Sequence, residues 1–309
     1  MTTLRVLRPV APADVVVVGR LHEAAEAADG HASLNDAVWR DLEHPGADSA
    51  GVLAVDGERA VAYAHAARGD NLASPHWDVG IVVHPDARHE RGIEADVLAA
   101  VADHVAGHGG GLAVLWMLGA DDRSDGAVAA AGFVPQRELL QMRMPLPPAE
   151  HPAWPAGTEV RAFVPGADDE AWLAVNNRAF AGHPEQGGWT KETLRRRMAE
   201  PWFDPAGFVL AFDDDGLAGF CWTKVQPAGP GRPDPLGEIF VIGVDPARHS
   251  RGLGRALVLA GLASLAQRGV ATGMLFVDGA NTAAVGLYES LGFTTLRRDR
   301  AYAREVAAA

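Results

Sequence analysis

The chain has 309 residues, of which 48% are hydrophobic, and it carries a formal net charge of −13. This length suits two domains of about 150 residues each, and the acidic balance argues against general nucleic-acid binding, which requires a basic surface. The sequence contains no charge-free apolar run of about 18 residues, which argues against a membrane span, and its single cysteine, Cys221, excludes an internal disulfide.

The first 30 residues predict a strand followed by a helix. They contain a short apolar patch but no basic segment followed by a small-residue cleavage site, so they do not resemble a signal peptide. Cys221 lies between Phe220 and Trp222, a setting typical of a small core residue. We therefore expect a cytoplasmic, monomeric protein without membrane or nucleic-acid partners.

An internal repeat divides the chain. Two segments recur in the same order: residues 79–98 resemble 241–258, and residues 129–133 resemble 289–293. Gly92 and Gly252 are 160 residues apart, and so are Gly132 and Gly292. The repeat predicts two copies of one fold, in domains 1–147 and 156–309. The proline-rich stretch 145–157 between them favours an extended linker.

The second copy gives the clearer sequence of elements. In chain order it predicts a strand at 158–164, a helix at 168–180, a hairpin at 208–226 turning at 213–216, a strand at 237–246, a helix at 252–269, a strand at 271–279, a helix at 281–292 and a last strand in the tail. Strands joined by crossover helices and hairpins predict an α/β fold. Each domain is expected to be a mixed, mostly antiparallel sheet flanked by helices.

A glycine-containing loop follows Val244 and leads into the helix at 252–269. Free N–H groups and the dipole at a helix start attract an anion, and glycine lets phosphate approach the backbone. The loop lacks both the P-loop motif and G-x-G-x-x-G. Taken alone, it leaves open the alternative of an ordinary turn between a strand and a helix.

A second motif, N-x-x-A-x-x-x-Y-x-x-x-G-F, runs from Asn281 to Phe293. The glycine loop followed by this motif resembles the GCN5-related N-acetyltransferase superfamily, which implies acetyl-CoA as co-substrate and no metal. The implied cofactor contacts are Ile242, Gly243 and Val244 at the pantetheine and acetyl carbonyl, the backbone amides of His249, Ser250, Arg251, Gly252, Leu253, Gly254 and Arg255 at the pyrophosphate, and Asn281, Thr282, Ala283, Ala284, Val285 and Gly286 at the pantetheine arm.

Two residues are candidates for proton transfer. Tyr288 lies seven residues after Asn281, two turns along the same helix face, and a phenol stays protonated at neutral pH, so it is a candidate general acid for the departing thiolate. Glu238 opens the strand that ends at the glycine loop and is a candidate base for the amine. The alternatives are a tyrosine that only packs against the sheet and a solvated glutamate at a strand end.

The N-terminal copy departs from this pattern. Its loop has one more residue before the glycine and carries Glu94 where the other copy has Gly254. Val128 replaces Tyr288, and Trp77 is placed in register with Glu238, although Asp78 is the next residue. The residues of a possible N-terminal cofactor loop are Ile81, Val82, Val83, His89, Arg91 and Gly92. A carboxylate at this helix start repels a pyrophosphate, so the first domain is predicted to be non-catalytic.

Further stretches resemble the mycothiol synthase family, which consists of tandem acetyltransferases. They include residues 175–190, 202–205, 220–225, 236–246 and 290–303, with thinner matches at 28–38, 81–85 and 139–146. The resemblance implies acetyl transfer to the cysteinyl amine of a cysteine–glucosamine–inositol conjugate, with Glu238 as base and Tyr288 as acid. It also implies substrate contacts by Asp36, Glu185, Lys224, Glu238 and Phe276. Asp36 and Phe276 stand where the family has glutamate and tyrosine, and Cys221 replaces a histidine.

Two other functions remain open on the sequence. One is an acetyltransferase of the same superfamily that acts on an aminoglycoside or a protein amine. The other is a non-catalytic module that binds acyl-CoA, which the pairing of Glu238 with Tyr288 disfavours.

Overall fold

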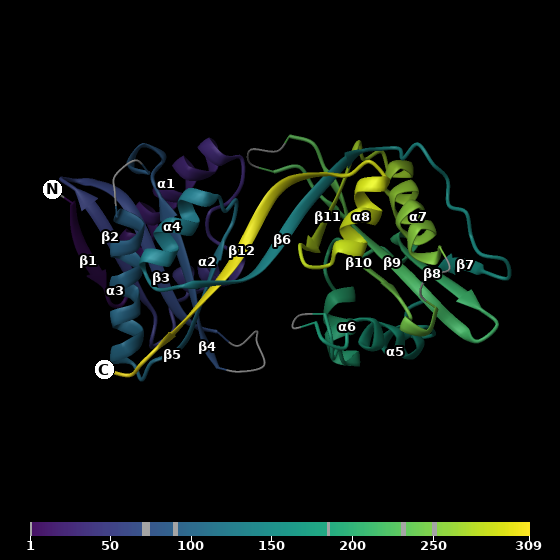
Figure 1. Ribbon diagram of the computed structural model, residues 1–309, viewed down its shortest axis with the longest axis horizontal. Coiled ribbons are helices and arrows are strands. Elements are labelled where there is room, and N and C mark those ends of the chain that lie inside the picture. The colour runs from purple at the N-terminus through teal and green to yellow at the C-terminus, as the bar shows by residue number, and fades with distance from the viewer. Residues whose placement is uncertain (1, 70–74, 89–91, 184–185, 230–232, 249–251) are drawn as a thin grey trace. The chain divides into compact units, whose positions relative to one another are not determined.

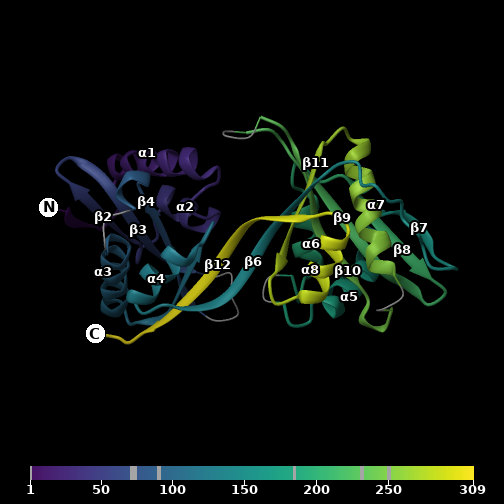
Figure 2. The ribbon, with the colours of Figure 1, turned by 45° about the horizontal axis from the view of Figure 1, so that its top comes forward.

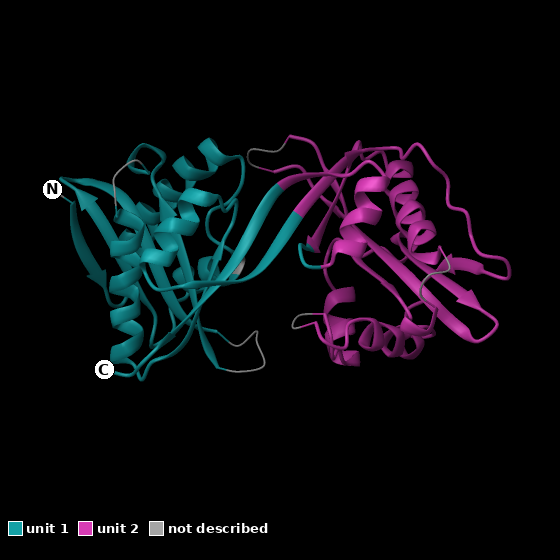
Figure 3. Cartoon of the chain, in the orientation of Figure 1, with its two compact units in different colours: residues 1–140, 278–280, 297–309 teal, residues 141–277, 281–296 magenta. Residues whose placement is uncertain are grey.

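The computed structural model describes residues 2–69, 75–88, 92–183, 186–229, 233–248 and 252–309. The chain divides into two compact units (Figure 3). Unit 1 comprises Met1–Leu140, Asp278–Ala280 and Arg297–Ala309, and unit 2 comprises Gln141–Val277 and Asn281–Leu296. The boundary between the two repeat copies, predicted to lie between residues 147 and 156, stays a prediction. The compact units differ from it in the tail, because the residues from Arg297 onward belong to unit 1.

Figure 1 labels the helices and strands. Elements up to residue 133 are β1 Thr2–Leu7, α1 Pro12–Asp29, α2 Asp36–Glu43, β2 Ala50–Asp56, β3 Arg59–Gly69, β4 His76–Val83, η1 Pro85–Ala87, α3 Ile93–Gly107, β5 Gly111–Met117 and α4 Asp122–Ala130. Then follow β6 Val134–Pro145, β7 Glu159–Ala162, α5 Asp169–Ala179, α6 Lys191–Met198, η2 Pro205–Gly207, β8 Phe208–Asp213, β9 Gly216–Gln226, β10 Leu236–Val244, η3 Pro246–Arg248, α7 Leu253–Gln267, β11 Thr272–Asp278, α8 Thr282–Ser290 and β12 Thr294–Val306. The elements predicted for the second copy are confirmed, whereas α6 was not predicted.

The strands of the described residues follow the order β1-β2-β3-β4-β5-β12-β6-β11-β10-β9-β8-β7. The pairs β4–β5 and β10–β11 are parallel, and the other pairs with a described register are antiparallel. Each parallel pair is bridged by a long crossover helix, α3 or α7, as parallel connections require. The predicted α/β fold with mixed, mostly antiparallel strands is confirmed.

The strands β6 and β12 each contribute to both units and lie side by side in Figures 1 and 2. Residues Arg300 to Val306 of β12 pair antiparallel with β5. In α4, Asp125 accepts hydrogen bonds from both Arg300 and the hydroxyl of Tyr302. The end of the chain therefore completes the sheet of unit 1.

Helices cover both faces of the sheet in each unit. In β2 the alternating side chains of Val52 and Leu53 enter different clusters, one formed with α3 and the other with α1 and α2. In unit 2 the α5 residue Trp172 packs on Phe208 and Trp222, while α7 contacts β9 and β10. No helix in the described ranges is long and apolar enough to cross a membrane.

Cys221 is a core residue of β9. It is fully buried, and a Cβ placed on Gly261 of α7 would lie 2.5 Å from its sulfur. Burial raises the pKa of the thiol to about 12, which keeps it in the unreactive, protonated form.

Candidate active site

The strands β10 and β11 separate within unit 2 and leave a cavity beside β10. Their parallel pairing covers Gly237 to Ile239 opposite Gly273 to Leu275. Farther along β10, Ile242, Gly243 and Val244 line a cavity of about 380 Å³. The register between β9 and β10 shifts between Ile239 and Val241, so Phe240 forms a β-bulge at the point of separation.

The N-terminus of α7 forms another wall of this cavity. Gly252 is the N-cap and has a φ of 78°, a left-handed conformation that favours glycine. A Cβ placed on Gly254 would lie 3.8 Å from Val244 Cγ2, an ordinary contact, so backbone packing alone does not require glycine there. The missing side chain instead leaves the first turn of α7 open to an anion.

Arg248, which precedes the N-terminus of α7, also lines the cavity. Its Nε lies 3.3 Å from Asp213 and its Nη1 lies 3.6 Å from Asp245. The hydrogen bond to Asp213 raises the pKa of Arg248. Burial opposes ionisation of Asp245, but the hydrogen bonds from Arg178 and from the N–H of Ala247 lower its pKa below the usual value.

The helix α8 brings Asn281 and Tyr288 to the same cavity. Asn281 caps α8 by accepting a hydrogen bond from the N–H of Ala284 at 3.2 Å, so its side-chain amide retains its donors. Two turns later, Tyr288 is 7% exposed and packs edge-on against Phe293. Burial raises the pKa of Tyr288 above its ordinary value, which keeps the phenol protonated.

Glu238 lies at the start of β10, is 8% exposed and is not among the residues that line the cavity. Its Oε2 accepts a hydrogen bond from Gln226 Nε2 at 2.7 Å and lies 4.0 Å from Lys224 Nζ. The Lys224 ammonium also lies over the rings of Trp202 and Phe240, at 5.0 and 5.8 Å from their centroids.

The chain is similar in sequence to known acetyltransferases. The Acetyltransferase (GNAT) family profile matches residues 172–293. The chain is 47% identical to a mycothiol acetyltransferase of Thermobispora bispora, over 98% of this chain and 100% of that one. It is 41% identical to a mycothiol acetyltransferase of Catenulispora acidiphila, over 97% of this chain and 98% of that one. The chain belongs to the mycothiol acetyltransferase family. It is therefore an acetyltransferase, and its family membership implies the use of acetyl-CoA.

Solved structures agree with this family in fold. A GCN5-related N-acetyltransferase from Sphaerobacter thermophilus matches with a TM-score of 0.73 and 24% identity, over 100% of this chain and 96% of that one. A tandem GNAT protein from the clavulanic acid biosynthesis pathway matches with a TM-score of 0.66 and 19% identity, over 100% of both chains. At these identities the likeness shows the tandem acetyltransferase fold alone.

Several of the site residues implied by the family resemblance lie in the cavity of unit 2. Ile242 to Val244, Gly252 to Gly254, Asn281 and Tyr288 share one cavity, and Lys224 lies beside Glu238. The Arg255 side chain donates hydrogen bonds to Glu150 and Ser290 and does not line the cavity. Its contact with the pyrophosphate through the backbone amide stays a prediction. Phe276 is 40% exposed on β11. Of the other predicted α8 residues, Ala283 and Ala284 line the cavity, whereas Thr282, Val285 and Gly286 do not. The predicted residues His249, Ser250, Arg251, Glu185, His89 and Arg91 lie outside the described residues, as does the side chain of Asp36 in α2.

Three residues around the Lys224–Glu238 pair were not predicted from the sequence: Gln226, which bonds Glu238, and Trp202 and Phe240, whose rings face Lys224. The signal for Gln226 was available, because Lys224 and Gln226 are two residues apart on one strand and point to the same face. Trp202 and Phe240 gave no such signal, since Trp202 precedes η2 and Phe240 owes its position to the bulge.

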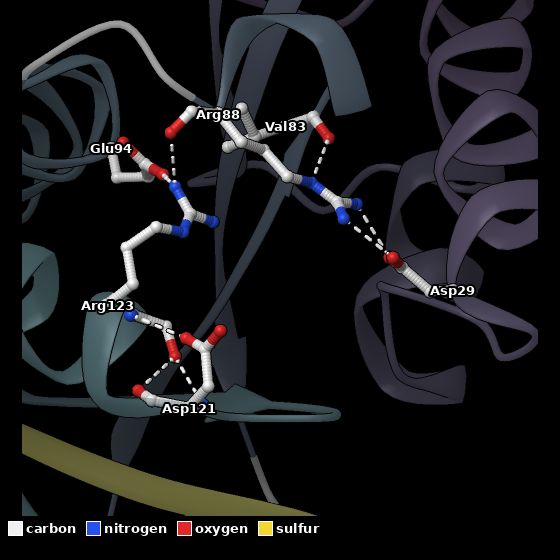
Figure 4. Close-up of polar contacts among 7 residues, drawn as sticks. Asp29, Val83, Arg88, Glu94, Asp121 and Arg123 are labelled. Atoms are coloured by element: carbon white, nitrogen blue, oxygen red, sulfur yellow. Dashed lines mark hydrogen bonds and ion pairs between the residues drawn. The ribbon is translucent and has the colours of Figure 1, made fainter.

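At the corresponding helix start of unit 1, an ion pair joins the first turn of α3 to α4 (Figure 4). Glu94 is 5% exposed, and its Oε1 accepts a hydrogen bond from Arg123 Nη1 at 2.6 Å. The same nitrogen donates to the carbonyl of Arg88 at 2.7 Å, while the Arg88 guanidinium bonds both carboxylate oxygens of Asp29. The sequence predicted a bare carboxylate at this position, whereas the structure pairs it with an arginine.

A smaller cavity of about 210 Å³ adjoins this pair in unit 1. Its lining includes Glu94, Arg123 and the predicted loop residues Ile81, Val82 and Val83. Gly92 retains the left-handed conformation of its counterpart, with a φ of 91°. Val128 is buried in the core. Gly92 thus keeps the conformation of Gly252, while the side chains in the first turn of the helix differ.

The register predicted for Trp77 is wrong. Asp78 lies opposite Val114 in the parallel pair of unit 1, as Glu238 lies opposite Met274 in unit 2. The bulge at Phe240 adds one residue to β10, whereas β4 pairs with β3 without a shift. Aligning the two copies from the loops therefore displaces the strand starts by one. Trp77 is a buried core residue that donates a hydrogen bond to the carbonyl of Gly110.

Proposed function

We propose that this acetyltransferase transfers acetyl from acetyl-CoA to the cysteinyl amine of 1D-myo-inositol 2-(L-cysteinylamino)-2-deoxy-α-D-glucopyranoside, giving mycothiol and CoA. The observation that carries the proposal is the 47% identity to a mycothiol acetyltransferase over the full length of that protein. A match that spans both units supports a shared substrate more strongly than a match to the acetyl-CoA motif alone.

The cavity of unit 2 is the proposed acetyl-CoA site. Its open first helical turn at Gly252 to Gly254 offers N–H groups to a pyrophosphate, and Arg248, which is paired with Asp213 and Asp245, lines the same cavity. Ile242 to Val244 and the amide of Asn281 offer hydrogen-bonding groups to a pantetheine arm. The cavity lies along β10 beyond the end of its pairing with β11 at Ile239, where strand groups can pair with an extended chain of this kind, which supports the assignment.

Bound acetyl-CoA supplies the acetyl group as a thioester. Glu238 is proposed to accept a proton from the substrate ammonium or amine, directly or through water, so that the nitrogen lone pair can form the amide bond. Tyr288 is proposed to give its phenolic proton to the sulfur as the carbon–sulfur bond breaks. The Tyr288 phenol is protonated at neutral pH, as a general acid must be before the transfer, and it lines the cavity proposed for acetyl-CoA.

The substrate carries an amine and many hydroxyl groups, which are bound by carboxylates and by a few donors. Lys224 and Glu238 lie together and meet that requirement. Glu185, Asp36 and Phe276 complete the proposed set by family resemblance. Two of them replace the usual family residue, so the fine contacts to the sugar and inositol are expected to differ from those of relatives.

Mass spectrometry of acetyl transfer tests the function. The protein is incubated with acetyl-CoA and the cysteinyl glucosaminyl-inositol, and in parallel with an aminoglycoside and a peptide amine. We expect a mass increase of one acetyl group on the first acceptor, with a kcat/KM at least 100-fold above the others. Preferred acetylation of another amine would assign the protein to that acceptor. Acetyl-CoA binding without any transfer would indicate a non-catalytic module.

A further inference from the structure

The Glu238 carboxylate is held from one side by the neighbouring strand β9. Lys224 lies directly opposite Glu238 in the antiparallel pair, and Gln226 lies diagonally opposite, paired with Leu236. Side chains at these two positions point to the same face of the sheet and reach a residue across the strand pair. Both therefore lie within reach of the carboxylate from the same strand.

The two side chains act on the same carboxylate oxygen. Gln226 Nε2 donates to Oε2 at 2.7 Å, and Lys224 Nζ lies 4.0 Å from Oε2. The described part of the chain records no hydrogen bond or ion pair to Oε1 of Glu238. The carboxylate thus has one oxygen fixed by a directional bond, while its other oxygen has no partner among the described residues.

Gln226 and Lys224 differ in what they can fix. The 4.0 Å separation is too long for a hydrogen bond, so Lys224 contributes charge but no direction. Its ammonium is also attracted by the faces of Trp202 and Phe240. Gln226 makes the short contact, and an amide that donates to a carboxylate restricts the rotation of that carboxylate.

We propose that Gln226 is a positioning residue for acetyl transfer: its amide fixes Oε2 of Glu238 and thereby aims Oε1 at the substrate amine. The inference rests on the proposed role of Glu238 as the base. It adds a residue on β9 through which the sheet sets the direction of proton transfer. Gln226 itself need not touch the substrate.

The first test compares Gln226→Leu and Gln226→Glu in the full-length protein. Leucine removes the donor, and glutamate keeps the shape of glutamine but replaces the donor with an acceptor. Leucine loses a hydrogen bond to a charged group, and glutamate places a second carboxylate against Oε2 that either repels Glu238 or shares a proton with it, so kcat is expected to fall about tenfold in each. The KM for acetyl-CoA should stay within twofold. Gln267→Leu, at the exposed end of α7, is the matched control and should leave kcat unchanged.

Wild-type activity in Gln226→Glu would overturn the proposal, since it would mean that shape suffices. A loss of acetyl-CoA affinity equal to the loss of kcat would also overturn it, because a disturbed fold affects both. Calorimetric titration with acetyl-CoA and circular dichroism on each variant supply that comparison.

A double-mutant cycle with Glu238→Gln is the sharper test. If Gln226 acts through the Glu238 carboxylate, then Gln226→Leu should change kcat less than twofold in the Glu238→Gln background. A further tenfold drop there would mean independent action and would overturn the inference. If Glu238→Gln has a severely lowered kcat while Gln226→Leu keeps the full kcat, the positioning role of Gln226 is overturned and the base role of Glu238 is not. A fully active Glu238→Gln would overturn the base assignment and this inference with it.

Discussion

In each unit a long helix, α3 or α7, follows the strand β4 or β10. The N-cap glycine of this helix has the same conformation in both units, while the side chains of the first turn differ. Gly92 and Gly252, at the N-caps of α3 and α7, both adopt a left-handed conformation, and a cavity adjoins each helix start. In unit 2 the first turn carries Gly254. In unit 1 it carries Glu94, which is paired with Arg123.

The comparison separates what the fold provides from what the reaction requires. The fold provides the strand separation, the left-handed glycine and the helix dipole in both units. Only unit 2 combines an open helix start with a buried phenol, because Val128 stands where the other copy has Tyr288. Activity is therefore expected to depend on a few side chains added to a shared scaffold.

The largest expected effect comes from replacing Gly254 of unit 2 by glutamate, the residue type that unit 1 has at the corresponding position. Gly254→Glu places a carboxylate at the pyrophosphate position with no arginine beside it, since Ala283 stands where unit 1 has Arg123. Two like charges about 4 Å apart repel by up to roughly 4 kcal/mol at an effective dielectric of 20. We expect the KM for acetyl-CoA to rise about 100-fold in steady-state assays of acetyl transfer.

Gly254→Ala is the control for this substitution. A Cβ at this position meets Val244 and Leu287 only at ordinary contact distance, so the alanine variant should stay within threefold of wild type. A negative charge at a helix N-terminus stabilises the helix, so the glutamate variant should remain folded. An alanine variant as damaged as the glutamate variant would show that space, and not charge, decides at this site.

The next effect concerns the phenol that unit 1 lacks. Tyr288→Phe is expected to lower kcat by 30- to 100-fold, roughly 2 to 3 kcal/mol, with acetyl-CoA affinity retained, because general-acid catalysis contributes about that much. Rapid-quench measurement of a single turnover reports the chemical step. An unchanged rate of that step would remove the role of Tyr288 as the acid.

The raised pKa of Tyr288 adds a pH signature to the wild-type enzyme. A general acid is active while protonated, so its activity is lost as the pH rises through its pKa, which burial places above the ordinary value of 10.0. We therefore expect no loss of single-turnover rate from this group between pH 8 and about 10. A decline in that range that disappears in Tyr288→Phe would contradict the raised pKa.

A smaller effect is expected at the strand that unit 1 receives from the end of the chain. Tyr302 is 1% exposed, and its hydroxyl donates to Asp125 of α4. Tyr302→Phe removes one hydrogen bond to a charged group and should lower the free energy of unfolding of unit 1 by about 1 to 2 kcal/mol. Amide exchange should quicken in β5 but not in β9, and kcat should not change. Faster exchange in β9 alone would contradict the assignment of the tail to unit 1.

The sequence predicted the fold well because its strongest signals are local. Turn residues between apolar runs marked the β8–β9 hairpin, and Gly252 and Gly269 marked the ends of α7. The spacing of Asn281 and Tyr288 placed both on one face of α8. These features depend on backbone conformations and on helical periodicity, which a single segment determines by itself.

Features that depend on pairing between distant segments were not predicted. The last strand was expected to belong to the second domain, yet its pairing with β5 places residues from Arg297 onward in unit 1. The bulge at Phe240 shifted the alignment of Trp77 with Glu238 by one residue. The arginine that neutralises Glu94 lies 29 residues farther along the chain, so only the fold brings the two charges together.

The smallest expected effect comes from opening the cavity of unit 1. The change requires two substitutions, because Glu94→Gly alone leaves the Arg123 guanidinium without its partner, and Arg123→Ala alone leaves a buried, unpaired carboxylate. The double variant Glu94→Gly/Arg123→Ala restores the residue types that unit 2 has at both places. Isothermal titration with acetyl-CoA and the acetyl-transfer assay are the two measurements.

For the wild-type protein, titration should give one tight acetyl-CoA site per chain. The double variant should gain a second, weaker site. Asp121, the N-cap of α4, stands where unit 2 has Asn281, the N-cap of α8, and it brings a negative charge toward the ligand. A dissociation constant at least tenfold above that of unit 2 corresponds to about 1.4 kcal/mol, a reasonable cost for one screened charge. The kcat should stay within twofold, because Val128 provides no acid for a second reaction. Two equally tight sites in the wild type would mean that the Glu94–Arg123 pair does not close this cavity to acetyl-CoA. Lost turnover in the double variant would mean that unit 1 contributes to catalysis through this loop.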